Sequence, residues 1–249
     1  LKSYGTGQYV PVQEKIGTPL DIVLVLDQSG SMDDTVNGVK KIDSLKTAVT
    51  NFVTSISNNA KGFKEAKHRI AIVGYASNDV NYNDQNGKFE NTGLFVNGTL
   101  KRYNNLNDND YKGALVNVNT GDNITNSITK AIGNIDASGA THTNYGLEMA
   151  NKVFSNNPIE SGSNRKRIVV VFTDGQPGKS SYEESVAGSA VNEAYKTKNT
   201  YAATVYSVGF YDSANRNVTN FMNYISSNYP GAEYKDVKHW LGTRTEFVE

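Results

Sequence analysis

The chain contains no cysteine among its 249 residues. It therefore cannot form a disulfide, a thiolate zinc site or a cysteine nucleophile. This absence leaves the compartment open, because a secreted domain with a large enough core does not need disulfides. Apolar residues make up 37% of the chain, which is enough to build such a core.

Net charge is also missing, since 25 basic residues balance 25 acidic ones. The electrostatic signature of a protein that binds nucleic acid or an anionic membrane is therefore absent. No apolar run approaches the roughly 20 residues that cross a bilayer, so no transmembrane segment is expected. The opening "LKSYGTGQYV" has neither an initiator Met nor the apolar core of a signal peptide, and we expect a mature fragment or an excised domain.

Short apolar runs alternate with helical patterns along the chain. Runs rich in β-branched or aromatic residues predict strands at 21–26, 68–76, 167–173 and 203–210. Apolar residues at spacings of three and four predict helices at 37–57 and, from weaker patterns, at 123–135, 144–155, 182–198 and 214–227. This alternation predicts an α/β fold, a doubly wound, mostly parallel open sheet with helices on both faces.

One domain is predicted at 20–249, after an N-terminal extension at 1–19. The segment at about 78–122 interrupts the alternation of strands and helices. It is rich in Asn, Asp, Gly and Tyr, and only 94–100 and 114–118 within it resemble strands. We interpret this segment as a surface insertion.

The insertion contains a weak calcium-loop pattern. Asp79, Asn81, Asn83 and Glu90 match four of its positions, but Asp84 stands where that loop requires Gly. Ordinary Asn-rich turns are the favoured interpretation.

Oxygen-bearing side chains follow the first predicted strand, in the stretch "DIVLVLDQSGSM". In an open α/β sheet, ligands bind at the loops that follow the carboxyl ends of the strands. On such a loop Asp27, Ser29 and Ser31 offer a carboxylate and two hydroxyls, and Gly30 allows a tight bend that lets them converge. Hard oxygen ligands without imidazole or thiolate select Mg²⁺, Mn²⁺ or Ca²⁺ over zinc or copper.

Two other predicted loops carry similar residues. Asp174 follows the strand predicted at 167–173, and Thr141 and Thr143 lie in a Gly-containing loop before the next helix. We expect Thr143 to cap the helix that starts near Asn144. The sequence therefore predicts an oxygen cage formed by three loops.

The order of these motifs resembles that of von Willebrand factor type A domains over residues 20–240. The D-x-S-x-S pattern at 27–31, the Thr in "GATHT" and the Asp in "TDG" resemble the metal-ion-dependent adhesion site of that family. The resemblance implies that Ser29 and Ser31 bind the metal directly, Thr141 directly or through water, and Asp27 and Asp174 mainly through water. The sixth position is then left for an acidic side chain of a protein ligand.

The same resemblance implies binding without catalysis, so no enzyme is predicted. In other members of the family, metal and ligand binding are coupled to a shift of the last helix, here the segment at 214–227. The insertion, the lack of cysteine and the abundance of Asn, Lys, Tyr and Thr resemble type A domains of Gram-positive pilus tips and surface adhesins. This implies an extracellular protein attached to the cell wall or pilus through parts outside this chain, with a host matrix or cell-surface protein as partner and a role in virulence.

Two alternatives stay open. A type A domain can serve as a protein-assembly module in which the metal only stiffens one face. The stretch "TDGQPGKSS" at 173–181 resembles a nucleotide-binding P-loop, but Thr173 replaces its first Gly and the charge of Asp174 would repel phosphate. His142 has no G-x-S-x-G nucleophile to pair with, so we expect a residue at the rim of the site.

Overall fold

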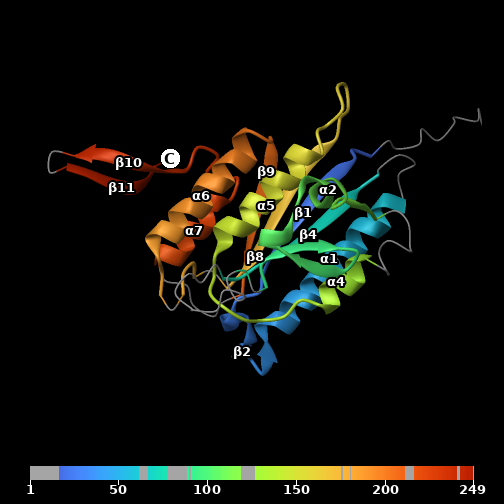
Figure 1. Cartoon of the computed structure of the whole chain (residues 1–249), viewed down its shortest axis with the longest axis horizontal. Coiled ribbons are helices and arrows are strands. Elements are labelled where there is room, and N and C mark those ends of the chain that lie inside the picture. The colour runs from blue at the N-terminus through green and yellow to red at the C-terminus, as the bar shows by residue number, and fades with distance from the viewer. Residues whose placement is uncertain are drawn as a thin grey trace, which may run out of the picture.

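The computed structural model describes residues 17–61, 67–77, 89, 91–118, 127–174, 176–179, 181–210, 216–239 and 242–248. Its central sheet has the strand order β6-β5-β4-β1-β8-β9, and β7 pairs with β4. Figure 1 labels β4, β1, β8 and β9 of this sheet. The four predicted strands are β1 (Leu20–Asp27), β4 (Arg69–Tyr75), β8 (Lys166–Thr173) and β9 (Ala203–Gly209). They pair in parallel, which confirms the predicted mostly parallel α/β sheet.

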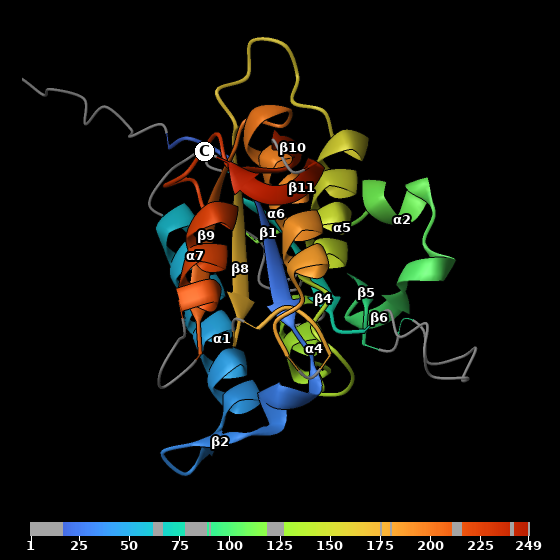
Figure 2. The same cartoon turned by 90° about the vertical axis from the view of Figure 1, so that its left-hand side faces the viewer.

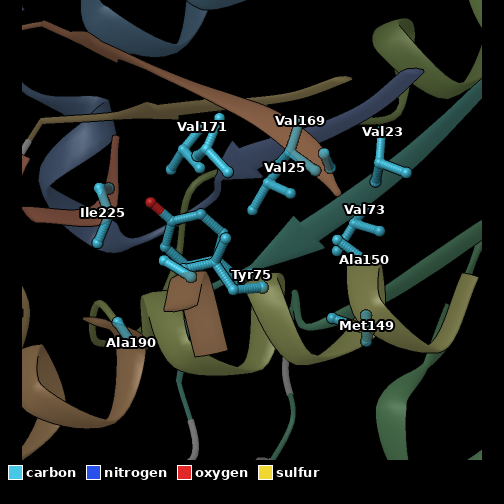
Figure 3. Close-up of a cluster of buried hydrophobic side chains, with 14 of the residues drawn as sticks. Val23, Val25, Val73, Tyr75, Met149, Ala150, Val169, Val171, Ala190 and Ile225 are labelled. Atoms are coloured by element: carbon cyan, nitrogen blue, oxygen red, sulfur yellow. The ribbon is translucent and has the colours of Figure 1, made fainter. Parts of the chain in front are cut away.

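Helices cover both faces of this sheet (Figure 2). On one face, α5 (Thr143–Asn156), α6 (Glu184–Asn199) and α7 (Arg216–Ile225) pack on Val23, Val25 and their neighbours (Figure 3). On the other face, α1 (Lys41–Lys61) and α4 (Thr129–Gly133) pack on Ile22, Leu24 and Leu26. Because successive strand residues point to opposite faces, a strand covered on both faces must be apolar throughout.

Helix α1 begins four residues later than the predicted start at 37. Residues before it form a short hairpin of β2 (Thr35–Val36) and β3 (Val39–Lys40). Asn37 and Gly38 both have positive φ, at 51° and 82°, as a two-residue hairpin turn requires. The helix predicted at 123–135 lies partly outside the described residues, and α4 is part of the remainder.

The described part of the segment at 78–122 extends the main sheet. Strands β5 (Gly93–Val96) and β6 (Thr99–Arg102) form an antiparallel hairpin beside β4, and Leu94 is fully buried. The 3-10 turn η2 (Tyr103–Asn105), the short helix α2 (Asp108–Lys112) and β7 (Val116–Asn117) complete it. The residues of the calcium-loop pattern, Asp79, Asn81, Asn83, Asp84 and Glu90, lie outside the described residues.

A second ribbon follows α7. Strands β10 (Glu233–His239) and β11 (Gly242–Val248) pair with each other and extend away from the body (Figure 1). The Tyr234 ring packs against Gly188 of α6, where an added Cβ would come within 2.2 Å of it. Within the described part of the chain, no helix is both long and apolar enough to cross a membrane.

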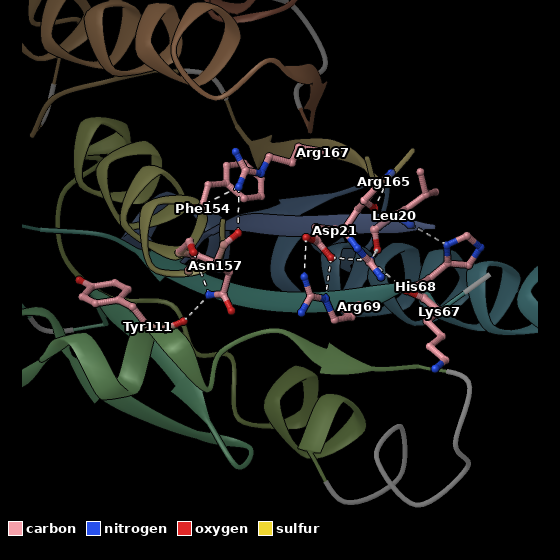
Figure 4. A network of polar contacts seen from close by, with 12 residues as sticks. Leu20, Asp21, Lys67, His68, Arg69, Tyr111, Phe154, Asn157, Arg165 and Arg167 are labelled. Carbon is pink, nitrogen blue, oxygen red and sulfur yellow. Dashed lines mark hydrogen bonds and ion pairs between the residues drawn. The ribbon is translucent and has the colours of Figure 1, made fainter. Parts of the chain in front are cut away.

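A buried ion-pair network closes the amino end of β1 (Figure 4). Asp21 is fully buried and accepts two hydrogen bonds from Arg69, both at 2.7 Å. Arg165 donates a third at 2.7 Å and also bonds the carbonyls of Leu20 and Lys67. A buried carboxylate with three charge-assisted hydrogen bonds is well compensated. Sequence patterns gave no sign of this network.

Gly146 allows α5 to pack closely on the sheet. A Cβ at this position would lie 2.5 Å from Val25 Cγ1 and 2.8 Å from Tyr75 Cδ1. We expect Gly146→Ala to lower the free energy of unfolding by about 1–3 kcal/mol, because overpacking outweighs the better helix propensity of Ala. Urea unfolding checks this. Gly133→Ala in α4, where nothing lies within 4 Å, is the matched control and should be neutral or slightly stabilising. Equal midpoints for the two variants would contradict the packing argument.

Candidate metal-binding site

The loop after β1 brings two hydroxyls together. Asp27 is the last residue of the strand, and its Oδ1 accepts a hydrogen bond from the backbone N–H of Ser29 at 2.9 Å. This bond turns the chain directly after the strand. The Oγ atoms of Ser29 and Ser31 then lie 3.1 Å apart, on the same side of the loop. The short 3-10 helix η1 (Gly30–Asp33) follows, and its Met32 is fully buried and fixes the loop to the core.

A second loop, which carries Thr141, is hydrogen-bonded to the first. The Gly30 N–H donates to the Gly139 carbonyl at 2.8 Å, and the Ser138 N–H donates to the Gln28 carbonyl at 2.8 Å. The Gln28 side chain is 1% exposed, accepts from the Asp136 N–H and donates to the Asn91 carbonyl. Gln28 therefore fixes the distance between the two loops.

The third loop follows β8 and is joined to both others. The Thr173 hydroxyl donates to Asp27 Oδ2 at 2.7 Å. The N–H groups of Thr141 and Gly178 each donate to the carbonyl of the other at 2.9 Å. Asp174, the residue after Thr173, is 9% exposed, and its Oδ1 is buried without a hydrogen-bond partner.

The three loops carry all five predicted site residues, namely Asp27, Ser29, Ser31, Thr141 and Asp174. Four of these are buried and Ser31 is half-buried. Their side chains offer two carboxylates and three hydroxyls. Within the residues that the structure describes, no cluster of three or more His, Cys, Asp and Glu side chains is placed to hold a metal, so a cation here would depend on the hydroxyls as well.

The two carboxylates interact unfavourably. Burial raises the pKa of Asp27 to about 6, and the charge of Asp174 adds to the increase. Hydrogen bonds from Ser29 and Thr173 oppose it. The ammonium of Lys41 lies 3.2 Å from Asp174 Oδ2 and is the nearest positive charge in the described structure. Two buried carboxylates, one with an unpaired oxygen, favour a further cation.

One local prediction is wrong. Thr143 makes no capping hydrogen bond; it is the first residue of α5, and its buried hydroxyl lies near that of Tyr75. The His142 N–H donates to the Ala76 carbonyl at 2.7 Å, which fixes the chain to the end of β4 and places His142 at the N-cap. His142 is half-buried beside the ring of Tyr145.

Sequence reasoning missed Thr173, Gln28 and Lys41 as parts of this site. Each acts through a contact with a residue more than a hundred positions away in the sequence. The only signal in the sequence was the position of Thr173 at the end of a buried strand.

The P-loop alternative finds little support in the geometry. The Gly178 N–H is bonded to Thr141, and the Lys179 N–H donates to the carboxylate of Glu183 at 3.0 Å. These amides are therefore not directed at a phosphate. Helix α6 begins only at Glu184, and Glu183 at its N-cap is acidic.

Solved structures with this fold include pilus proteins. The pilus adhesin SpaC of Lactobacillus rhamnosus GG superposes with a TM-score of 0.60 at 19% identity, covering 87% of this chain and 28% of that chain. The vWF domain of the type V pili tip protein Mfa5 of Porphyromonas gingivalis gives a TM-score of 0.56 at 14% identity, covering 86% of this chain and 88% of that chain. The PilB minor pilin of Streptococcus sanguinis gives 0.53 at 14% identity, covering 91% and 58%.

The chain thus spans 28% of SpaC and 58% of PilB. No curated protein matches it significantly in sequence. The sequence profile of the von Willebrand factor type A domain matches residues 21–240. This match includes the described strands of the main sheet, apart from Leu20 at the start of β1, and all three loops of the site. The chain belongs to the von Willebrand factor type A domain family.

Proposed function

We propose that this domain binds a protein ligand through a divalent cation, Mg²⁺ or else Mn²⁺ or Ca²⁺. The observation that carries the proposal is the pair of buried carboxylates, Asp27 and Asp174, of which Asp174 has an oxygen without a partner. The Ser29 and Ser31 hydroxyls, 3.1 Å apart, add neutral ligands to the same loops. This donor set suits a hard cation.

The residues divide into two roles. Ser29, Ser31 and Thr141 would hold the cation with neutral oxygens, and Asp27 and Asp174 would balance part of its charge, mainly through water. When bound, a cation with so little direct neutralisation supplies a strong acceptor for a carboxylate of the partner. Thr173 and the Ser29 amide keep Asp27 in place through their hydrogen bonds. No catalysis is proposed, because the role assigned to the cation is to bind a carboxylate of the partner.

We further propose that the domain belongs to a surface or pilus-tip adhesin, at the bacterial cell surface, that binds a host matrix or cell-surface protein. The pilus proteins that share its fold support this assignment. The competing role, a type A domain that only assembles other proteins, predicts binding that does not depend on the metal. The two roles therefore differ in their response to chelation.

The test is surface plasmon resonance against a panel of immobilised extracellular-matrix proteins. We expect binding in 2 mM Mg²⁺, loss in EDTA and recovery when Mg²⁺ is returned, the usual mass-action behaviour of a required metal. Ser29→Ala should weaken binding at least about tenfold, because one metal ligand is lost. The matched control is Ser189→Ala, which removes an exposed hydroxyl bonded only to the Ser185 carbonyl. Binding that persists unchanged in EDTA would refute the proposal.

A further inference from the structure

Lys41 is a charged residue beside the candidate metal site that the proposed function does not use. It is the first residue of α1, and its side chain is 15% exposed. Its Nζ lies 3.2 Å from Asp174 Oδ2 and 3.7 Å from Asp34 Oδ2. A lysine this buried is uncommon unless its charge is paired.

Lys41 neutralises the charge of Asp174, as a metal ion at the site would do. It is the only ammonium or guanidinium group that the described structure pairs with Asp174, whose side chain is 5% exposed. A divalent cation held by Asp174 would lie near the same carboxylate and would repel this ammonium. The ammonium and the metal ion therefore interact with the same carboxylate, and each weakens the binding of the other to it.

Lys41 also anchors the hairpin at residues 35–40. Its backbone N–H donates to the Asp34 carbonyl at 2.9 Å, and the preceding residue, Lys40, pairs with Asp33 at 2.6 Å. Figure 2 shows this hairpin at the end of the molecule toward which β1 and β8 point, where the site lies. Lys41 thus connects the hairpin to the site.

We propose that Lys41 is an internal counter-ion that competes with a divalent cation for Asp174, and so sets the affinity of the site for metal. The inference rests on the function proposed above. Lys41 neutralises Asp174 when no metal is bound and releases it when metal binds. The backbone of Lys41 stays hydrogen-bonded to Asp34 after the ammonium is released. Only the Lys41 side chain and the base of the hairpin are therefore expected to move.

The first test is isothermal titration calorimetry of the whole chain with MgCl₂ at pH 7.5. Lys41→Met keeps the length and apolar stem of the side chain and removes its charge, so we expect Mg²⁺ to bind about tenfold more tightly. Lys40→Met is the control: it removes the same charge one residue away, from an exposed side chain that pairs with Asp33. Its affinity for Mg²⁺ should stay within about twofold of the wild type, since an exposed pair contributes little.

A second test does not require a variant. Acetic anhydride labels free lysine amines, and mass spectrometry measures the labelling of each residue. We expect saturating Mg²⁺ to raise the labelling rate of Lys41 severalfold and to leave that of Lys40 unchanged. This measurement decides the matter if Lys41→Met fails to fold.

The outcomes separate the two proposals. If Mg²⁺ binds the wild type but Lys41→Met binds it equally or more weakly, or if Lys41 labelling does not rise, the competition is refuted and the proposed function stands. If neither the wild type nor Lys41→Met binds Mg²⁺, Mn²⁺ or Ca²⁺, both proposals fall. Tighter binding in Lys41→Met alone, together with the rise in labelling, supports the competition.

Discussion

Replacing Asp27 by Asn is expected to make the protein more stable in EDTA at pH 7.5 and to abolish its binding of Mg²⁺. Asp27 is fully buried, and its pKa is raised to about 6 by burial and by the charge of Asp174. Ionising it within the fold costs about 3 kcal/mol, and Asn avoids most of that cost while keeping the shape. A gain of about 1–3 kcal/mol in the free energy of unfolding is therefore expected.

The raised pKa of Asp27 also predicts how the free energy of unfolding changes with pH. The unfolded Asp27 carboxyl ionises near 3.8, whereas the folded one holds its proton to about 6. The folded state binds more protons in this window, so the stabilisation is full below 3.8 and is lost as pH rises through 6. In EDTA the wild type should lose stability between pH 4 and pH 7, and Asp27→Asn should lose less.

Urea unfolding at pH 5 and pH 7.5, with EDTA or Mg²⁺, measures both effects, and calorimetry measures Mg²⁺ binding. Mg²⁺ should stabilise the wild type and leave Asp27→Asn unaffected, because only a folded protein with a metal site gains from the ion. Asp33→Asn removes the same charge from an exposed side chain in the same loop and should change neither property. A variant that is less stable than the wild type in EDTA would show that the Asp27 charge is not costly.

The sequence predicted those parts of the site that follow from local position. Asp27 and Asp174 each follow a buried apolar strand, and parallel strands bring such ends to one edge of a sheet. Alternation of strands and helices then places the Thr141 loop at the same edge. The meeting of the three loops that carry the five candidate residues was predictable, because each loop lies where its own stretch of chain ends a strand or enters a helix.

The rest depends on contacts that no local pattern records. Thr173 bonds Asp27 across 146 positions, and Lys41 pairs with Asp174 across 133. Gln28 reads as a neutral spacer within D-x-S-x-S, yet its buried amide joins three segments. By contrast, the late start of α1 was visible in the sequence, since Asn37-Gly38 is a strong hairpin signal that outweighed the helical pattern beside it.

The second large effect concerns a carboxylate at the other end of the same strand. Asp21 is the second residue of β1 and Asp27 is its last, and both carboxylates are buried. Asp21, however, accepts three hydrogen bonds from Arg69 and Arg165 (Figure 4). We expect Asp21→Ala to lower the free energy of unfolding by about 3 kcal/mol, because it leaves two guanidinium groups facing each other without a counter-charge. Urea unfolding at pH 7.5 measures this loss.

The affinity of Asp21→Ala for Mg²⁺ should be unchanged, since the substitution lies at the amino end of β1 and the site at its carboxyl end. The two variants would then separate stability from metal binding. Asp21→Ala would lower stability and leave metal binding intact, whereas Asp27→Asn would raise stability and abolish metal binding. An equal loss of Mg²⁺ affinity in both variants, at a temperature where both are folded, would mean that the site depends on the whole strand rather than on Asp27. The opposite signs follow from one physical difference, which is that Asp21 already has its cations within the chain whereas Asp27 lacks a paired one.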